Sequence, residues 1–146
     1  MSDFSGQCLC GAIAFRVAPP TLFCVHCHCR FCRLAHGAAF VTWVGVAEDR
    51  FSFERGEDLV TWYQSSEQSR RGFCSRCGAT MLYVSTLSPG EVHVARAYLS
   101  GEIDREPKAH VFFDHRAPWA PVADGLRTVG SDSPQLERYR QVEPPP

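Results

Sequence analysis

CSRCG (residues 74–78) places two cysteines within one turn and follows them with a glycine, and CLCG (residues 8–11) repeats this arrangement near the N-terminus. Glycine after the second cysteine allows a positive φ, so backbone N–H groups can turn toward the sulfurs. Two such zinc knuckles supply four thiolates, the ligand set of a closed tetrahedral zinc. The sequence therefore predicts a structural zinc that ties the first strand to the middle of the chain and stabilises the fold. Its ligands would be Cys8, Cys10, Cys74 and Cys77.

Disulfides and independent buried thiols are the alternatives for these cysteines. The N-terminus MSDFSGQC (1–8) has neither the basic segment nor the apolar stretch of a signal peptide. No apolar run approaches the roughly 18 to 20 residues that a membrane span requires. We therefore expect a cytoplasmic protein without a membrane partner, in a reducing compartment where disulfides are disfavoured. The net charge of −1 and the lack of a basic stripe argue against a nucleic-acid partner.

Most of the chain alternates between apolar and polar residues with a period of two, which is typical of half-buried strands. The sequence predicts a mainly β, single compact domain of short antiparallel strands in two or three small sheets, cross-linked by the zinc knuckles. The helical candidates are a turn around residues 28–36 and SPQLERYRQ (133–141). The expected strands are residues 12–17, 39–46, 50–54, 59–64, 80–85, 91–98 and 110–114.

FCVHCHCRFCRLAHG (residues 23–37) holds a cysteine group of a different kind. Cys27, Cys29 and Cys32 form C-x-C-x-x-C with no glycine after the last cysteine. Three ligands from one short segment with an open fourth position are typical of catalytic zinc sites. The fourth position is open to water, a substrate thiol, Cys24, or one of the histidines 26, 28 and 36. If Cys24 closes the shell, the second site is structural; otherwise Cys24 is a small buried residue.

Four segments together resemble the glutathione-dependent formaldehyde-activating enzyme (GFA) family, which includes the centromere protein V-like domain. They are GQCLCGAIAFRV (6–17), HCHCRFCRLAHGAAF (26–40), SRRGFCSRCGATML (69–82), and AHVFFDHRAPW (109–119) followed by DGL (124–126). The resemblance covers residues 5–125, which we take as a zinc-binding domain. Residues 126–146 are then a C-terminal extension, partly disordered, ending in VEPPP (142–146).

The resemblance implies roles for both cysteine groups. The knuckle cysteines fall on the family's structural zinc ligands, and Cys27, Cys29 and Cys32 fall on its catalytic zinc ligands. The family's namesake reaction joins glutathione to formaldehyde and gives S-hydroxymethylglutathione, which is a carbon–sulfur lyase reaction. We therefore expect a zinc-dependent enzyme that acts on a thiol adduct of a small aldehyde, with a thiol such as glutathione as its partner. The alternative is a non-catalytic zinc-stabilised β module with both zinc sites structural.

A thiol bound to an open zinc becomes a thiolate, and its addition to an aldehyde creates an alkoxide that needs a proton. The acid candidates are the histidines 26, 28, 36 and 110. A thiol such as glutathione also carries carboxylates, which arginine binds through two parallel hydrogen bonds. Arg33 lies next to the second cysteine group and is the candidate contact for a thiol carboxylate. The sequence does not predict an oligomeric state.

Overall fold

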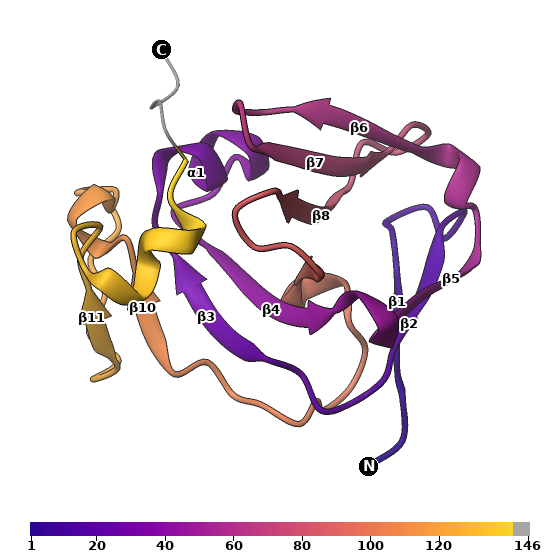
Figure 1. The fold of residues 1–146 in the computed structure, drawn as a ribbon, viewed down its shortest axis with the longest axis horizontal. Helices are drawn as coiled ribbons and strands as arrows, with labels where there is room; N and C mark the ends of the chain where they lie inside the picture. Colours follow the sequence, from indigo (N-terminus) through magenta and orange to yellow (C-terminus); the bar gives the residue numbers. More distant parts are fainter. Residues whose placement is uncertain (142–146) are drawn as a thin grey trace.

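The computed structural model describes residues 1–141, so the predicted disorder of VEPPP (142–146) lies outside the described residues. The described part of the chain is built from short strands, with one α-helix, α1 (Arg30–His36), and five 3-10 helices (Figure 1). The 3-10 helices are η1 (Glu48–Arg50), η2 (Glu57–Leu59), η3 (Arg96–Tyr98), η4 (Phe113–His115) and η5 (Pro134–Tyr139). The strands are β1 (Phe4–Gln7), β2 (Ala14–Val17), β3 (Phe23–Cys27), β4 (Val41–Ala47), β5 (Phe51–Arg55), β6 (Val60–Gln64), β7 (Ser69–Cys74), β8 (Thr80–Ser85), β9 (Glu91–Ala95), β10 (Ala109–Val111) and β11 (Arg127–Val129).

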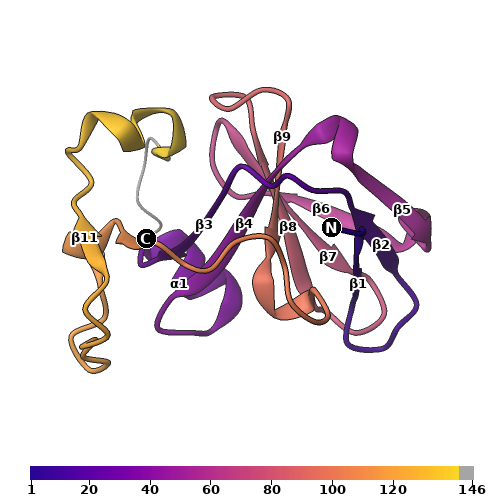
Figure 2. The ribbon, with the colours of Figure 1, turned by 90° about the horizontal axis from the view of Figure 1, so that it is seen from below.

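These strands form two sheets, one of three strands in the order β1-β2-β5 and one of eight in the order β11-β10-β3-β4-β9-β8-β7-β6. The mainly β domain of antiparallel strands is confirmed, although the larger sheet exceeds the expected size. One edge of that sheet also differs, because β10 runs parallel to both β3 and β11. Figure 2 shows the three-stranded sheet at one end of the molecule and β11 at the other.

All seven expected strands correspond to observed ones, and four further strands were not expected: β1, β3, β7 and β11. The alternation pattern did not predict strand β7, because polar residues occupy its inward positions, with Ser69 and Arg71 both buried. Strand β3 was not predicted, because cysteines and a histidine stand where a strand usually has aliphatic residues. The helical turn at 28–36 is confirmed as α1, and the segment 133–141 holds η5.

Two apolar cores lie on opposite faces of the larger sheet. The first contains Phe15, Val44 and Met81, which are fully buried. The second surrounds the cysteines of residues 27–32 and includes Trp43. Adjacent residues of β4, Trp43 and Val44, point to different cores because successive side chains of a strand face opposite ways.

Part of the expected C-terminal extension is packed against the second core. Strand β11 pairs with β10, and Leu136 of η5 is buried. The domain boundary after residue 125 stays a prediction. No helix among residues 1–141 is long and apolar enough to cross a membrane.

Candidate metal centres and an adjoining cavity

The two zinc knuckles meet in space. The sulfurs of Cys8, Cys10, Cys74 and Cys77 all lie within 4.8 Å of one another. The Sγ atoms of Cys8 and Cys10 are 3.6 Å apart, and those of Cys10 and Cys74 are 3.9 Å apart. A tetrahedral zinc with bonds of about 2.3 Å places its sulfurs about 3.8 Å from each other. The donor set and its spacing therefore fit zinc.

The knuckle backbones have the conformation that the glycines predicted. Gly11 and Gly78 both have a φ of 76°. The N–H of Ile13 donates to the Sγ of Cys8 at 3.3 Å, and the N–H of Arg76 lies 3.4 Å from the sulfur of its own knuckle. Such donors stabilise negative charge on the sulfurs.

The second cysteine group lies where β3 passes into α1. Cys27 ends the strand, Cys29 is the N-cap of the helix, and Cys32 lies in its first turn. The sulfur of Cys29 accepts the N–H of Cys32 at 3.4 Å, as an N-cap side chain should. All three residues are buried, and their sulfurs lie within 4.8 Å of one another. This set offers three thiolates to one metal and leaves a fourth position.

Cys24 is not part of this group. It lies three positions before Cys27 on β3, an odd offset, so the two side chains face opposite sides of the sheet. Cys24 is packed in the first core, where burial raises the pKa of its thiol to about 11. This placement fits a small buried residue rather than a fourth ligand.

The sulfur of Cys32 is surrounded by hydrogen-bond donors. The thiols of Cys27 and Cys29 donate to it, as do the indole of Trp43 at 3.3 Å and the guanidinium of Arg71 at 3.6 Å. These hydrogen bonds, together with the charge of Arg71, hold the pKa of Cys32 well below its usual range.

The environment of Arg71 also favours a metal at the second cysteine group. Its side chain is buried, and its Nε and one terminal nitrogen have no hydrogen-bond partner among the described residues. A buried cation needs nearby negative charge. Three thiolates around a divalent zinc carry a net charge of −1, which Arg71 neutralises. The residues present therefore fit a zinc ion.

One row of side chains crosses the larger sheet on the same face as Cys32. Cross-strand partners place Arg71 opposite Tyr83, Tyr83 opposite His93, His93 opposite Gly45, and Gly45 opposite Phe23. The guanidinium lies 5.0 Å from the centre of the Tyr83 ring, and the Tyr83 and His93 rings stack at 5.4 Å. The position of Gly45 in this row requires glycine, because a Cβ at that position would lie 2.3 Å from the Phe23 ring.

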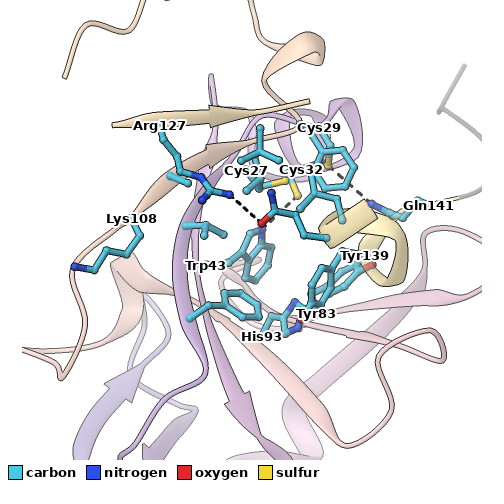
Figure 3. Close-up of a pocket in the computed structure, with 18 residues that line it drawn as sticks. Cys27, Cys29, Cys32, Trp43, Tyr83, His93, Lys108, Arg127, Tyr139 and Gln141 are labelled. Carbon is cyan, nitrogen blue, oxygen red and sulfur yellow. Dashed lines mark hydrogen bonds between the residues drawn. The ribbon is translucent and has the colours of Figure 1, made fainter. Parts of the chain in front are cut away.

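A cavity of about 300 Å³ lies over this row and reaches the three sulfurs. Its wall is mostly aliphatic and aromatic, and two exposed cations, Lys108 and Arg127, lie at one side (Figure 3). The Gln141 amide also donates toward the sulfur of Cys29, at 3.9 Å. The lining comprises Phe23, Val25, Cys27, Cys29, Cys32, Trp43, Tyr83, His93, Lys108, Ala109, Val111, Phe112, Arg127, Val129, Gln135, Leu136, Tyr139 and Gln141.

His93 is the histidine that lines this cavity. Its Nε2 lies 2.8 Å from Oε2 of Glu91, and the hydroxyl of Tyr139 donates to the other oxygen of Glu91 at 3.3 Å. The hydrogen bond to Glu91 fixes the orientation of the imidazole ring. Sequence analysis missed His93, since its neighbours along the chain are ordinary strand residues.

The expected acid candidates are placed elsewhere. His26 precedes Cys27 and faces the other side of β3, where its ring lies 4.8 Å from that of His110. His28 and His110 share a hydrogen bond of 2.7 Å, and His110 bonds to Asp124 at 2.8 Å. His36 is packed edge-on against Trp43, and burial lowers its pKa to about 4. None of these histidines lines the cavity.

Arg33 does not line the cavity either. Its guanidinium donates to the carbonyl oxygens of His28 at 3.2 Å and His115 at 2.9 Å, so it ties α1 to η4. Lys108 and Arg127 are the cations that border the cavity. Neither was singled out in the sequence, because both lie far along the chain from the cysteines.

Comparisons with known proteins agree with this arrangement. A family model described as "Glutathione-dependent formaldehyde-activating enzyme" matches residues 3–115. A Halomonas elongata protein named "Putative glutathione-dependent formaldehyde-activating enzyme" is 26% identical over 125 residues, covering 80% of this chain and 79% of that protein. An uncharacterized lyase of Schizosaccharomyces pombe is 33% identical over 88 residues, covering 59% of this chain and 61% of the lyase. A crystal structure of a Rhodobacter sphaeroides protein superposes with a TM-score of 0.57 and 27% identity, covering 68% of this chain and 91% of that one.

Proposed function

The chain belongs to the glutathione-dependent formaldehyde-activating enzyme family, and from this premise we propose that it is a zinc-dependent carbon–sulfur lyase-type enzyme. Its substrate would be the adduct of a thiol and an aldehyde, as in the family's reaction of glutathione with formaldehyde. We assign one structural zinc to the knuckles and a second zinc to Cys27, Cys29 and Cys32. Fold alone does not fix a substrate, so the proposal rests on the site.

The observation that carries this proposal is the cavity that ends at three buried sulfurs. A closed structural site would have a fourth protein ligand, and the nearest further cysteine in the sequence, Cys24, lies in the other core. The three cysteines instead border a space that a small molecule can enter. This arrangement is the one expected when a substrate thiol completes the shell.

Zinc at this position would supply a Lewis acid at which a substrate thiol loses its proton near neutral pH. The chain's own residues then have three tasks. Arg71 balances the negative charge of the sulfurs, the apolar wall excludes water, and His93 handles the proton. Glu91 holds the imidazole of His93 in place for this task.

The addition step needs no reactant besides the thiol and the aldehyde. A C–S bond forms between the thiol sulfur and the carbonyl carbon, while the π electron pair of the C=O bond moves to oxygen. The proton released by the thiol reaches that oxygen through His93, and no oxidation or reduction occurs. The lyase direction reverses these movements.

Cobalt substitution tests the open position, because its absorption bands report the number of sulfurs around each metal. The expected result is two cobalt ions per chain, one of which gains a thiolate when glutathione is added. Two sites that already have four sulfurs and ignore glutathione would refute the proposal. The protein would then be the zinc-stabilised binding module.

A further inference from the structure

We infer, on the premise of the proposed function, that the preferred carbonyl substrate carries an apolar group about as large as a phenyl ring. The first observation is volume. The cavity beside the sulfurs measures about 300 Å³. A protein cavity of about 150 Å³ already holds benzene, which has six heavy atoms. Formaldehyde has only two heavy atoms, so the hydroxymethyl group that it adds to the thiol would fill little of this space.

The second observation is the chemistry of the wall next to the metal ligands. Strands β10 and β3 pair in parallel, and Val111 is the cross-strand partner of Cys27. Val111 lines the cavity together with Val129 and Leu136, so aliphatic groups begin directly beside the sulfurs. An apolar group attached to the reacting carbon would contact this wall.

Aromatic rings form the facing wall of the cavity. Phe23 contacts His93 edge-on with ring centres 5.0 Å apart, and Phe23 contacts Tyr139 edge-on at 5.6 Å. Trp43 lies at the metal end, where its N–H is directed to Cys32. Such a wall gains free energy by covering apolar surface, which a hydroxymethyl group does not offer.

The two exposed cations of the site lie at its border. Lys108 and Arg127 are exposed, and Arg127 also donates to Gln135 at 2.9 Å. Both cations can bind the carboxylates of a thiol such as glutathione outside the apolar space. This separation assigns the polar arms of the thiol to the border and the side group of the aldehyde to the interior.

The experiment measures exchange between free and thiol-bound aldehyde by NMR, with the zinc-loaded protein and glutathione as the fixed thiol. The aldehydes are formaldehyde, acetaldehyde, butanal, hexanal and phenylacetaldehyde. Each catalysed second-order rate constant is divided by the uncatalysed one, which removes differences in intrinsic reactivity. We expect this ratio to rise about fourfold per buried methylene, since each contributes about 0.8 kcal/mol, and to be high for phenylacetaldehyde.

Ala109→Leu adds bulk inside the cavity, where Ala109 is buried in β10. We expect it to lower the ratio of hexanal to acetaldehyde activity by at least about tenfold. Ala97→Leu is the matched control, because Ala97 is exposed in η3 and does not line the cavity. Val129→Ile adds one carbon to the same wall and replaces Ala109→Leu if that variant does not fold.

The possible outcomes separate this inference from the proposed function. Rate ratios that rise with chain length in the native protein and fall in Ala109→Leu support it. Ratios that are highest for formaldehyde and decline with chain length overturn it, while the proposed function stands. Absence of turnover with every aldehyde overturns both.

Discussion

Replacing one cysteine in each metal site should have unequal effects on stability. Cys74→Ser removes a knuckle ligand, whereas Cys29→Ser removes a ligand of the second site. Serine is chosen at position 29 because the Cys29 sulfur also caps α1, accepting the N–H of Cys32 at 3.4 Å. A serine hydroxyl keeps that cap, whose loss to alanine would cost about 1 kcal/mol by itself.

The magnitudes follow from how each site is assembled. The knuckles join residues 8–10 to residues 74–77, so the unfolded chain does not hold the four sulfurs together. Structural zinc of this kind contributes about 10–16 kcal/mol in zinc-finger peptides, as much as the whole stability of about 5–15 kcal/mol of a typical domain. We therefore expect Cys74→Ser to unfold or aggregate.

The second site is local, since its three cysteines lie within residues 27–32. The unfolded segment keeps these ligands close and still binds metal, which reduces the net stabilisation of the folded state. We expect Cys29→Ser to lose less than about 2 kcal/mol, a fall in melting temperature of at most about 8 °C for a domain of this size.

The assay combines zinc analysis, thermal unfolding followed by circular dichroism, and activity. Native protein should hold two zinc ions, and Cys29→Ser should hold one, with a folded spectrum and no activity. Equal collapse of both variants would refute the division into a structural and a catalytic site. Full activity in Cys29→Ser would also refute this division, because the second site would then not be catalytic.

Three further substitutions probe the surroundings of the second site. Trp43→Phe keeps an aromatic ring, although a smaller one, and removes the N–H donor 3.3 Å from Cys32. Competition with a chelator should therefore show zinc affinity about 10–100-fold weaker at this site only, and unchanged affinity would contradict this role. Gly45→Ala puts a methyl group 2.3 Å from the Phe23 ring, so urea unfolding should show a loss of about 1–3 kcal/mol, and no loss would mean the ring moves freely. His93→Gln should lower kcat about 10²–10⁴-fold with both zinc ions retained, whereas an unchanged kcat would exclude this proton donor.

The cysteine groups could be predicted from the sequence because their geometry is local. Cys27, Cys29 and Cys32 lie within one strand end and one helical turn, so spacing alone brings their sulfurs together. Each knuckle was predictable for the same reason, because its two cysteines lie close together along the chain. That the two pairs meet followed from the number of ligands zinc requires.

The rest of the site depends on the register of the sheet. Arg71, Tyr83 and His93 come from three different strands and become neighbours only when β7, β8 and β9 pair. The same alternation places His26 on the opposite face of β3 from Cys27, since side chains share a face only at positions i, i+2 and i+4. A sequence shows which residues alternate but not which strands are adjacent, so Arg33 was chosen for its proximity along the chain.

The wall of the cavity comes from residues on both sides of the end of the family match. Six of the 18 lining residues lie beyond residue 115, where the family match ends. These six are Arg127, Val129, Gln135, Leu136, Tyr139 and Gln141. None of them is a cysteine, so substitutions in this stretch can reshape the wall while the metal ligands stay in place. Chimaeras that swap this stretch are therefore a direct route to redesigned specificity.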